Sequence, residues 1–216
     1  MRTLLLLAAL LWTGPAAAGA WMREAGTVFL AFSTVYDDTG TLDGSAYLEY
    51  GLRPKLTLGA KLDVDMTKGR MGDGTAFVFL RRPIDRWDTA YQLAYELGFG
   101  TTFGDGADPL LRSGLSYGRG FTLWDRNGWL AVDAAIEWAL DNGPNTAKLD
   151  TTLGLTLNDR FQVMMQVFVT NSSAFSNTTL APSVIWQPNA KTPSYQLGVE
   201  VDDDTWAVKL GLWRSF

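Results

Sequence analysis

Apolar and polar residues alternate with a period of two along most of the chain, in segments bounded by Gly, Pro, Asn or Asp. In 55–66, for example, Leu58, Leu62 and Val64 share one face, whereas Lys61 lies on the other. Twelve segments follow this pattern: 27–36, 45–52, 55–66, 75–82, 89–100, 109–118, 128–140, 147–157, 160–170, 178–187, 193–202 and 205–216. Because successive side chains of a strand point to opposite faces, the pattern predicts an all-β protein.

The length of these segments separates two kinds of β protein. Strands of soluble sandwiches usually have about five or six residues, whereas a tilted strand needs about 9–11 residues to cross the hydrocarbon of a bilayer. Since an open sheet edge cannot be satisfied in lipid, we expect a closed antiparallel up-and-down transmembrane β-barrel of about 12 strands. Ten strands are the alternative if 75–82 or 178–187 does not span, and a soluble periplasmic β protein is a third interpretation.

The start of the chain has the pattern of an export leader. A positive charge precedes the apolar run from Leu4 to Trp12, which is too short for a membrane-spanning helix. Small residues follow, so that cleavage is expected after Ala18 or Ala20. We therefore expect a leader at 1–20 and a barrel at 21–216.

Composition narrows the possible functions. The sequence has neither cysteine nor histidine, and its formal net charge is −5. A Ser-His pair, a Cys-His pair and an ordinary zinc site cannot be built without these side chains, so we expect no enzyme, no cofactor and no metal site. An acidic chain without a basic cluster also argues against nucleic acid as a partner.

If the apolar faces contact lipid, the opposite faces line a polar, net-negative lumen. The expected lining residues are Glu49, Lys61, Asp63, Asp65, Glu96, Arg112, Asp133, Glu137, Lys148, Asp150, Glu200 and Lys209, together with Asp202. Small residues beside them would leave space in the lumen: Gly59, Gly98, Gly114, Gly154 and Gly198. Acidic residues outnumber basic ones in this set, because only Lys61, Arg112, Lys148 and Lys209 are basic.

Two functions are compatible with such an interior. As a channel, the surplus of carboxylates would favour passive passage of small neutral or cationic solutes. As a structural or surface-interaction barrel, the same carboxylates would pair with the bases across a narrow lumen and close it. We favour passage, because the acidic residues outnumber the basic ones and cannot all be paired one to one; the closed barrel is the alternative.

Aromatic residues lie near the expected strand ends, where rings match the level of the lipid headgroups. With the N-terminus in the periplasm, Tyr36, Phe99, Trp138 and Trp206 mark the outer rim, and Tyr50, Tyr91, Tyr117, Trp186, Tyr195 and Phe216 mark the inner one. The stretch from Phe121 to Asn127 is long for an inner turn. It is the weakest point of the assignment.

The last segment alternates up to a C-terminal phenylalanine. Its apolar face consists of Trp206, Val208, Leu210, Leu212 and Phe216. This resembles the terminal strand of bacterial outer-membrane β-barrel proteins, which the barrel-insertion machinery reads. The resemblance implies a location in the outer membrane of a Gram-negative bacterium, with membrane lipid, lipopolysaccharide and that machinery as partners. It identifies no particular family within the class.

Overall fold

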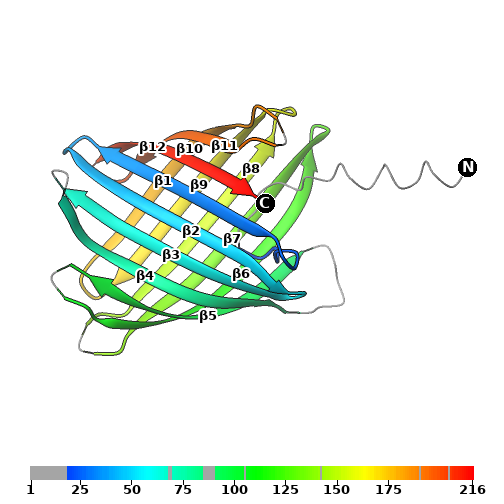
Figure 1. Cartoon of the computed structure of the whole chain (residues 1–216). Coiled ribbons are helices and arrows are strands. Elements are labelled where there is room, and N and C mark those ends of the chain that lie inside the picture. The colour runs from blue at the N-terminus through cyan, green and yellow to red at the C-terminus, as the bar shows by residue number, and fades with distance from the viewer. Residues whose placement is uncertain are drawn as a thin grey trace, which may run out of the picture.

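The structure, a computed structural model, describes residues 19–67, 70–84, 91–104, 106–141, 143–189, 191–203 and 205–216. Within these ranges the chain forms one closed barrel, in which each strand pairs antiparallel with its neighbours in sequence and β1 pairs with β12 (Figure 1). The strands are β1 (Val28–Asp37), β2 (Thr41–Arg53), β3 (Leu56–Thr67), β4 (Arg70–Pro83), β5 (Gln92–Phe103), β6 (Pro109–Leu123), β7 (Arg126–Ala139), β8 (Thr146–Thr156), β9 (Phe161–Ser172), β10 (Ser176–Trp186), β11 (Ser194–Val201) and β12 (Trp206–Ser215).

The fold confirms the predicted barrel and its twelve strands. The segments 75–82 and 178–187 both belong to full strands, β4 and β10, so the ten-strand alternative is wrong. The stretch from Phe121 to Asn127 is not a long loop. The strands β6 and β7 extend through it and leave a two-residue turn at Trp124 and Asp125, whose φ angles are 51° and 58°. Positive φ at both central residues is typical of the type I′ turn, which matches the twist of antiparallel strands.

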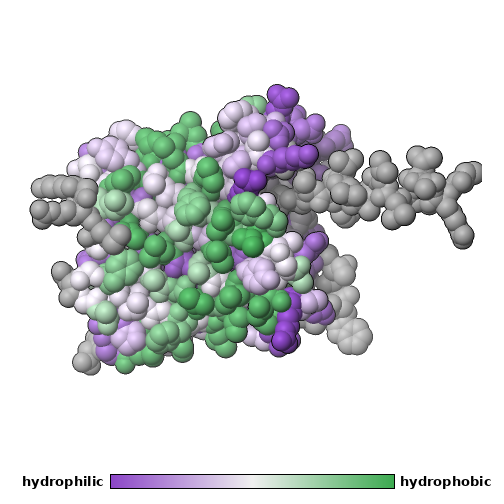
Figure 2. Space-filling view, in the orientation of Figure 1, coloured by the Kyte–Doolittle hydropathy of each residue, from purple (hydrophilic) through white to green (hydrophobic). Residues whose placement is uncertain are grey.

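The barrel is apolar outside and polar inside, the reverse of a soluble protein. Figure 2 shows apolar residues spread over the middle of the outer surface. Many of the large outward-facing side chains are exposed, among them Val78, Leu80, Leu97, Leu111, Leu115, Ile136, Leu153, Leu197 and Leu210. Exposure of so much hydrocarbon is compatible with lipid as the surrounding solvent.

One residue leaves the expected lipid face. The register between β3 and β4 shifts between Val64 and Met66. Val64 is buried, and it lines the interior together with both of its neighbours, Asp63 and Asp65. A β-bulge has this effect, because its extra residue lets adjacent side chains face the same side.

The two termini of the barrel close it. The backbone N–H of Phe216 donates to the carbonyl of Val28 at 2.9 Å, and that of Val28 donates to the carbonyl of Phe216 at 3.2 Å. The outward side chains of β12 include the exposed Trp206, Val208 and Leu210 and the half-buried Leu212, and the exposed Phe216 follows the strand directly. The terminal strand therefore supplies the seam of the barrel.

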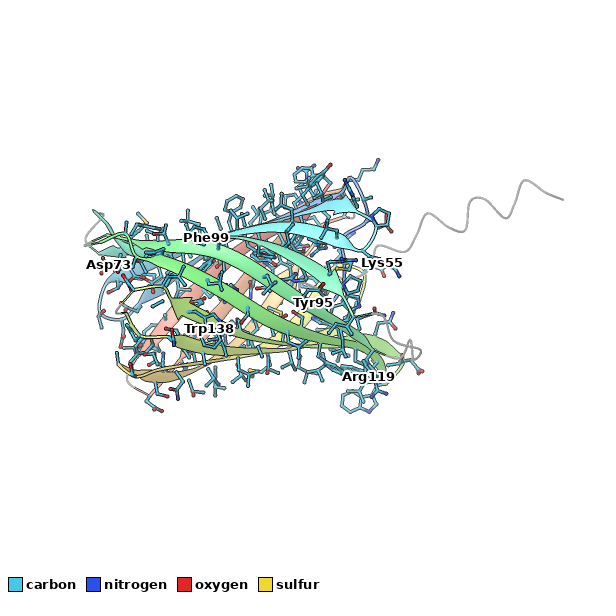
Figure 3. All side chains as sticks on the ribbon, turned by 90° about the horizontal axis from the view of Figure 1, so that it is seen from below. Lys55, Asp73, Tyr95, Phe99, Arg119 and Trp138 are labelled. Atoms are coloured by element: carbon cyan, nitrogen blue, oxygen red, sulfur yellow. The ribbon has the colours of Figure 1, made fainter. Side chains whose placement is uncertain are left out.

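The start of β1 and the end of β12 lie at the same end of the barrel, which we call the proximal end; the other is the distal end. Figure 3 shows Lys55 and Arg119 at the proximal end, Asp73 at the distal end, and Phe99 and Trp138 on the outer wall. No helix with the length and hydropathy needed to cross a bilayer is present in the described part of the chain.

Candidate functional site

The barrel encloses a cavity of about 550 Å³, a volume in the range of small-molecule sites. The expected lumen residues that line it are Lys61, Asp63, Asp65, Glu96, Arg112, Asp133, Lys148, Asp150, Glu200 and Lys209. Glu49 and Glu137 lie deeper, in buried ion pairs along the wall. Asp202 lies in the connection between β11 and β12, where its Oδ1 accepts a hydrogen bond from the N–H of Thr205 at 2.8 Å.

A continuous chain of alternating charges runs along the inner wall from the segment before β1 to β8. We call it the charge ladder, and its members in order are Arg23, Glu49, Arg81, Glu96, Arg112, Glu137 and Lys148. Each glutamate lies between two cations. Because every charge is paired on at least one side, a low-dielectric wall can hold them together.

The strand register brings the middle of the charge ladder together. Arg81 is directly opposite Glu96 on β4 and β5, and Arg112 is opposite Glu137 on β6 and β7. The Nη2 atom of Arg81 lies 2.7 Å from Oε2 of Glu96, and Nε of Arg112 lies 2.7 Å from the other oxygen of that carboxylate. Glu96 thereby links the two opposite pairs into one chain.

Aromatic side chains and a hydroxyl support the cations of the charge ladder. The guanidinium carbon of Arg81 lies 5.0 Å from the centre of the Phe79 ring, and that of Arg23 lies 4.3 Å from the Phe29 ring. The Tyr47 hydroxyl donates to Glu49 at 2.6 Å and accepts from Nη2 of Arg81 at 3.1 Å. These contacts fix the positions of charges that have little access to water.

Arg23 and Arg81 were absent from the expected lumen residues, and both belong to the charge ladder. The inward face of β4 carries Phe77 and Phe79 as well as Arg81, and its outward face is also apolar. Alternation therefore cannot identify the lumen face of this strand. Arg23 precedes the first strand, so no periodicity applies to it, although its position between the leader and β1 is a usable signal.

Among the charged lining residues outside the charge ladder, carboxylates outnumber cations. Lys61 pairs with Asp63 at 2.9 Å, and Lys209 pairs with Glu200 at 2.8 Å. Within the described part of the chain, every basic side chain that lines the cavity is thus in an ion pair. Four lining carboxylates have no cation within ion-pair distance there, namely Asp43, Asp65, Asp133 and Asp150.

Packed side chains occupy the proximal part of the lumen. Trp129, Met164 and Ile185 form a buried apolar cluster, against which Trp21 and Trp213 pack. All come from the proximal ends of their strands except Trp21, which precedes β1. We call this group the proximal cluster. Water and solute have less room there than in the cavity above it.

The glycines of the inner wall do not widen the lumen as expected, because neighbouring side chains cover them. A Cβ atom added to Gly59 would lie 2.0 Å from Cζ of Phe79, and one added to Gly154 would lie 2.1 Å from the Trp129 ring. The same holds for the remaining members of the set, where the neighbours are Phe79 at Gly98, Glu96 at Gly114 and Ser183 at Gly198. These glycines allow large side chains to lie flat against the wall.

The described residues contain no group of three or more His, Cys, Asp or Glu side chains that could hold a metal ion. Asp133 and Glu137, two acids on the same face of β7, have different surroundings. Glu137 binds Arg112 and Lys148, whereas Asp133 lies beside Gly19. The interior is thus a polar cavity whose proximal end is filled by packed side chains.

No family model and no curated protein matches the sequence. Among solved structures, the KdgM porin in complex with disordered oligogalacturonate is similar with a TM-score of 0.66 and 8% identity, over 87% of this chain and 99% of that one. The NanC porin gives 0.62 and 10%, over 85% and 98% of the two chains. An outer-membrane channel from Pseudomonas putida F1 gives 0.54 and 12%, over 94% and 99%.

The chain has the fold of bacterial outer-membrane β-barrel proteins. This confirms the fold expected from the alternation and the C-terminal strand. At identities of 8–12%, the similarity extends to the architecture and not to any one protein's ligand.

Proposed function

We propose that the protein is an outer-membrane β-barrel of a Gram-negative bacterium through which small neutral or cationic solutes diffuse passively. The charge balance of the cavity carries this proposal. Every described basic side chain on the lining has an ion-pair partner, whereas Asp43, Asp65, Asp133 and Asp150 do not. Carboxylates without paired cations raise the local concentration of cations and repel anions.

This chemistry differs from what an anionic ligand requires. The KdgM porin forms a complex with oligogalacturonate, whose carboxylates need free cations for recognition. Here Arg81 and Arg112 are each shared between two glutamates, so that their guanidinium groups are already engaged. A neutral or cationic solute would leave these pairs intact.

The apolar outer surface and the terminal strand support the proposed location and partners. Lipid and lipopolysaccharide would surround the barrel. The barrel-insertion machinery would recognise β12 through its outward Trp206, Val208, Leu210, Leu212 and Phe216. The proximal end, which carries both termini of the barrel, would face the periplasm.

The proximal cluster favours a second candidate function, that of a closed structural or surface-interaction barrel. Five large side chains meet where a solute would have to leave the lumen. If they do not separate, the cavity is a blind pocket that opens only toward the distal end. The two candidates therefore differ in what happens at Trp21, Trp129 and Trp213.

Single-channel recording in planar bilayers distinguishes them. We expect the refolded wild-type protein to give small discrete conductance steps. Trp129→Ala should increase the step by roughly twofold or more, because it shortens a side chain of the packed proximal cluster. The control is Trp124→Ala, which removes a tryptophan that is 80% exposed in the β6–β7 turn and should leave the step unchanged.

Folding is checked by heat-modifiable migration on a gel, and insertion by protection from protease in vesicles. Silent bilayers with correctly inserted wild-type and Trp129→Ala protein would contradict solute passage. That result would support the closed barrel instead.

A further inference from the structure

The segment from Gly19 to Glu24 lies inside the barrel and is bound to its wall. Gly19 and Ala20 are buried, and Ala20 is 2% exposed. The backbone N–H of Arg23 donates to Oγ1 of Thr57 at 3.3 Å, and the Arg23 side chain joins the charge ladder. A chain that continued freely out of the barrel would not need these contacts.

The wall is shaped to receive this segment. A Cβ atom added to Gly118 on β6 would lie 2.6 Å from the Trp21 ring and 2.9 Å from Cβ of Ala20. One added to Gly51 on β2 would lie 1.9 Å from the carbonyl oxygen of Glu24. Only glycine allows such close approach, so two strands carry a matching seat for the segment.

Where this segment begins, one oxygen of a buried carboxylate lacks a hydrogen-bond partner among the described residues. This oxygen is Oδ1 of Asp133. A Cβ atom added to Gly19 would lie 2.5 Å from that oxygen and 2.7 Å from the other. The backbone nitrogen of Gly19, two bonds from that position, therefore lies within about 5 Å of the carboxylate.

We propose that the export leader is cleaved between Ala18 and Gly19, and that the new α-ammonium group of Gly19 pairs with Asp133 inside the barrel. In this step a leader peptidase hydrolyses the Ala18–Gly19 peptide bond with water. Ala18 leaves as a carboxylate, and Gly19 gains an ammonium group. The ion pair satisfies the buried oxygen of Asp133 and holds the segment against the wall beside the proximal cluster.

The structure distinguishes this cleavage site from the one after Ala20, which the sequence fits equally. Cleavage after Ala20 would remove Gly19 and leave the buried Oδ1 of Asp133 without the proposed ammonium partner. It would also discard Ala20, which packs over Gly118. A Cβ atom at position 19 would collide with the Asp133 carboxylate, and glycine at the new terminus avoids that contact.

Mass spectrometry of the N-terminal peptide tests the cleavage site. The full chain is expressed with its own leader and extracted from the outer membrane. We expect Gly19 as the first residue. A mature chain that begins at Trp21, or one that retains the leader, would overturn the proposal. This result does not depend on solute passage, so it can fail independently of the conductance measurements.

Amine labelling at neutral pH tests the ion pair. In the folded barrel, the α-amine of Gly19 should react at least about tenfold more slowly than in the heat-unfolded protein. Asp133→Asn should restore most of the lost reactivity. Asp43→Asn is the matched control, because it removes another cavity carboxylate that has no ion pair among the described residues but lies at the distal end of β2, and it should leave labelling slow.

If Asp133→Asn does not fold, insertion of a serine between Ala18 and Gly19 replaces it, because the ammonium is then displaced by one residue and should react faster. Wild-type labelling at the unfolded rate would contradict a held terminus. Equally slow labelling in wild-type and Asp133→Asn protein would show that Asp133 is not its partner.

Discussion

The proximal and distal parts of the lumen contain different kinds of side chains. The proximal part is filled by tryptophans, by the chain segment from Gly19 to Glu24 and by one end of the charge ladder. The distal part holds Asp43, Asp65 and Glu200, and only Glu200 of these has a cation partner. Under the proposed function, packing would set how wide the proximal part is, whereas uncompensated charge would set which solutes enter the distal part.

The largest effect should come from breaking the charge ladder at Arg81. Arg81→Ala leaves Glu49 and Glu96 each without one of their two cations in a buried wall. We expect the free energy of unfolding in lipid vesicles to fall by about 3–5 kcal/mol. Arg119→Ala, which removes an exposed arginine at the proximal end, should change it little. Equal stability of the two variants in a denaturant titration would show that the charge ladder is not structural.

A smaller loss of stability is expected from adding a Cβ atom where an aromatic ring covers a glycine. Gly59→Ala places a Cβ atom 2.0 Å from the Phe79 ring, which lies under the Arg81 guanidinium and must move. We expect destabilisation of about 1–3 kcal/mol in the same titration. Gly44→Ala is the control, because nothing lies within 4 Å of an added Cβ there. If both variants were equally stable, the ring would not need the glycine.

Neutralising the distal acids should change selectivity more than stability. The double variant Asp43→Asn and Asp65→Asn removes two lining carboxylates that form no ion pair with any described residue. We expect the preference for potassium over chloride to fall roughly threefold, with the conductance step retained. Asp63→Asn is a useful comparison, because it frees Lys61 and adds a positive charge to the lining. An unchanged preference in both variants would place the selective region elsewhere.

The smallest effect concerns two loop acids outside the membrane-spanning strands. A hydrogen bond to Asp141 and the charge of that residue raise the pKa of Asp108 above 3.8, whereas the pKa of Asp141 is lowered, chiefly by the N–H of Gly143. The contribution of Asp108 to loop stability is therefore present at low pH and is lost as the pH rises through its folded pKa. In an NMR titration, Asp141→Asn should lower the pKa of Asp108. A pKa of Asp108 that stayed raised would exclude Asp141 as the cause.

The sequence predicts the outside of this barrel better than its inside. On β7, the outward residues from Leu130 to Trp138 are all apolar and Asp133 and Glu137 mark the other face, so alternation identifies both faces. On β4, Phe77 and Phe79 face inward, so both faces are apolar and the role of Arg81 is hidden. Contact with the membrane favours apolar side chains at the outer positions. Inner residues are instead stabilised by specific contacts with one another.

Pairing in the interior depends on register, which the sequence does not specify. Arg81 and Glu96 meet because β4 and β5 align them, and Arg23 reaches Glu49 only because the chain folds back into the lumen. The covered glycines have the same origin, since the ring over Gly59 comes from the neighbouring strand. Counting acids and bases along the chain thus predicts that the lumen has a net negative charge. It does not identify which carboxylates remain without an ion pair.

The reversal potential of the wild-type protein in a potassium chloride gradient across a planar bilayer tests the account most directly. Passage through a lumen whose cations are paired and whose distal carboxylates are not predicts a potential with the sign of potassium permeation. Raising the salt concentration should reduce it, because salt screens exposed charges. A potential with the sign of chloride permeation would contradict the account.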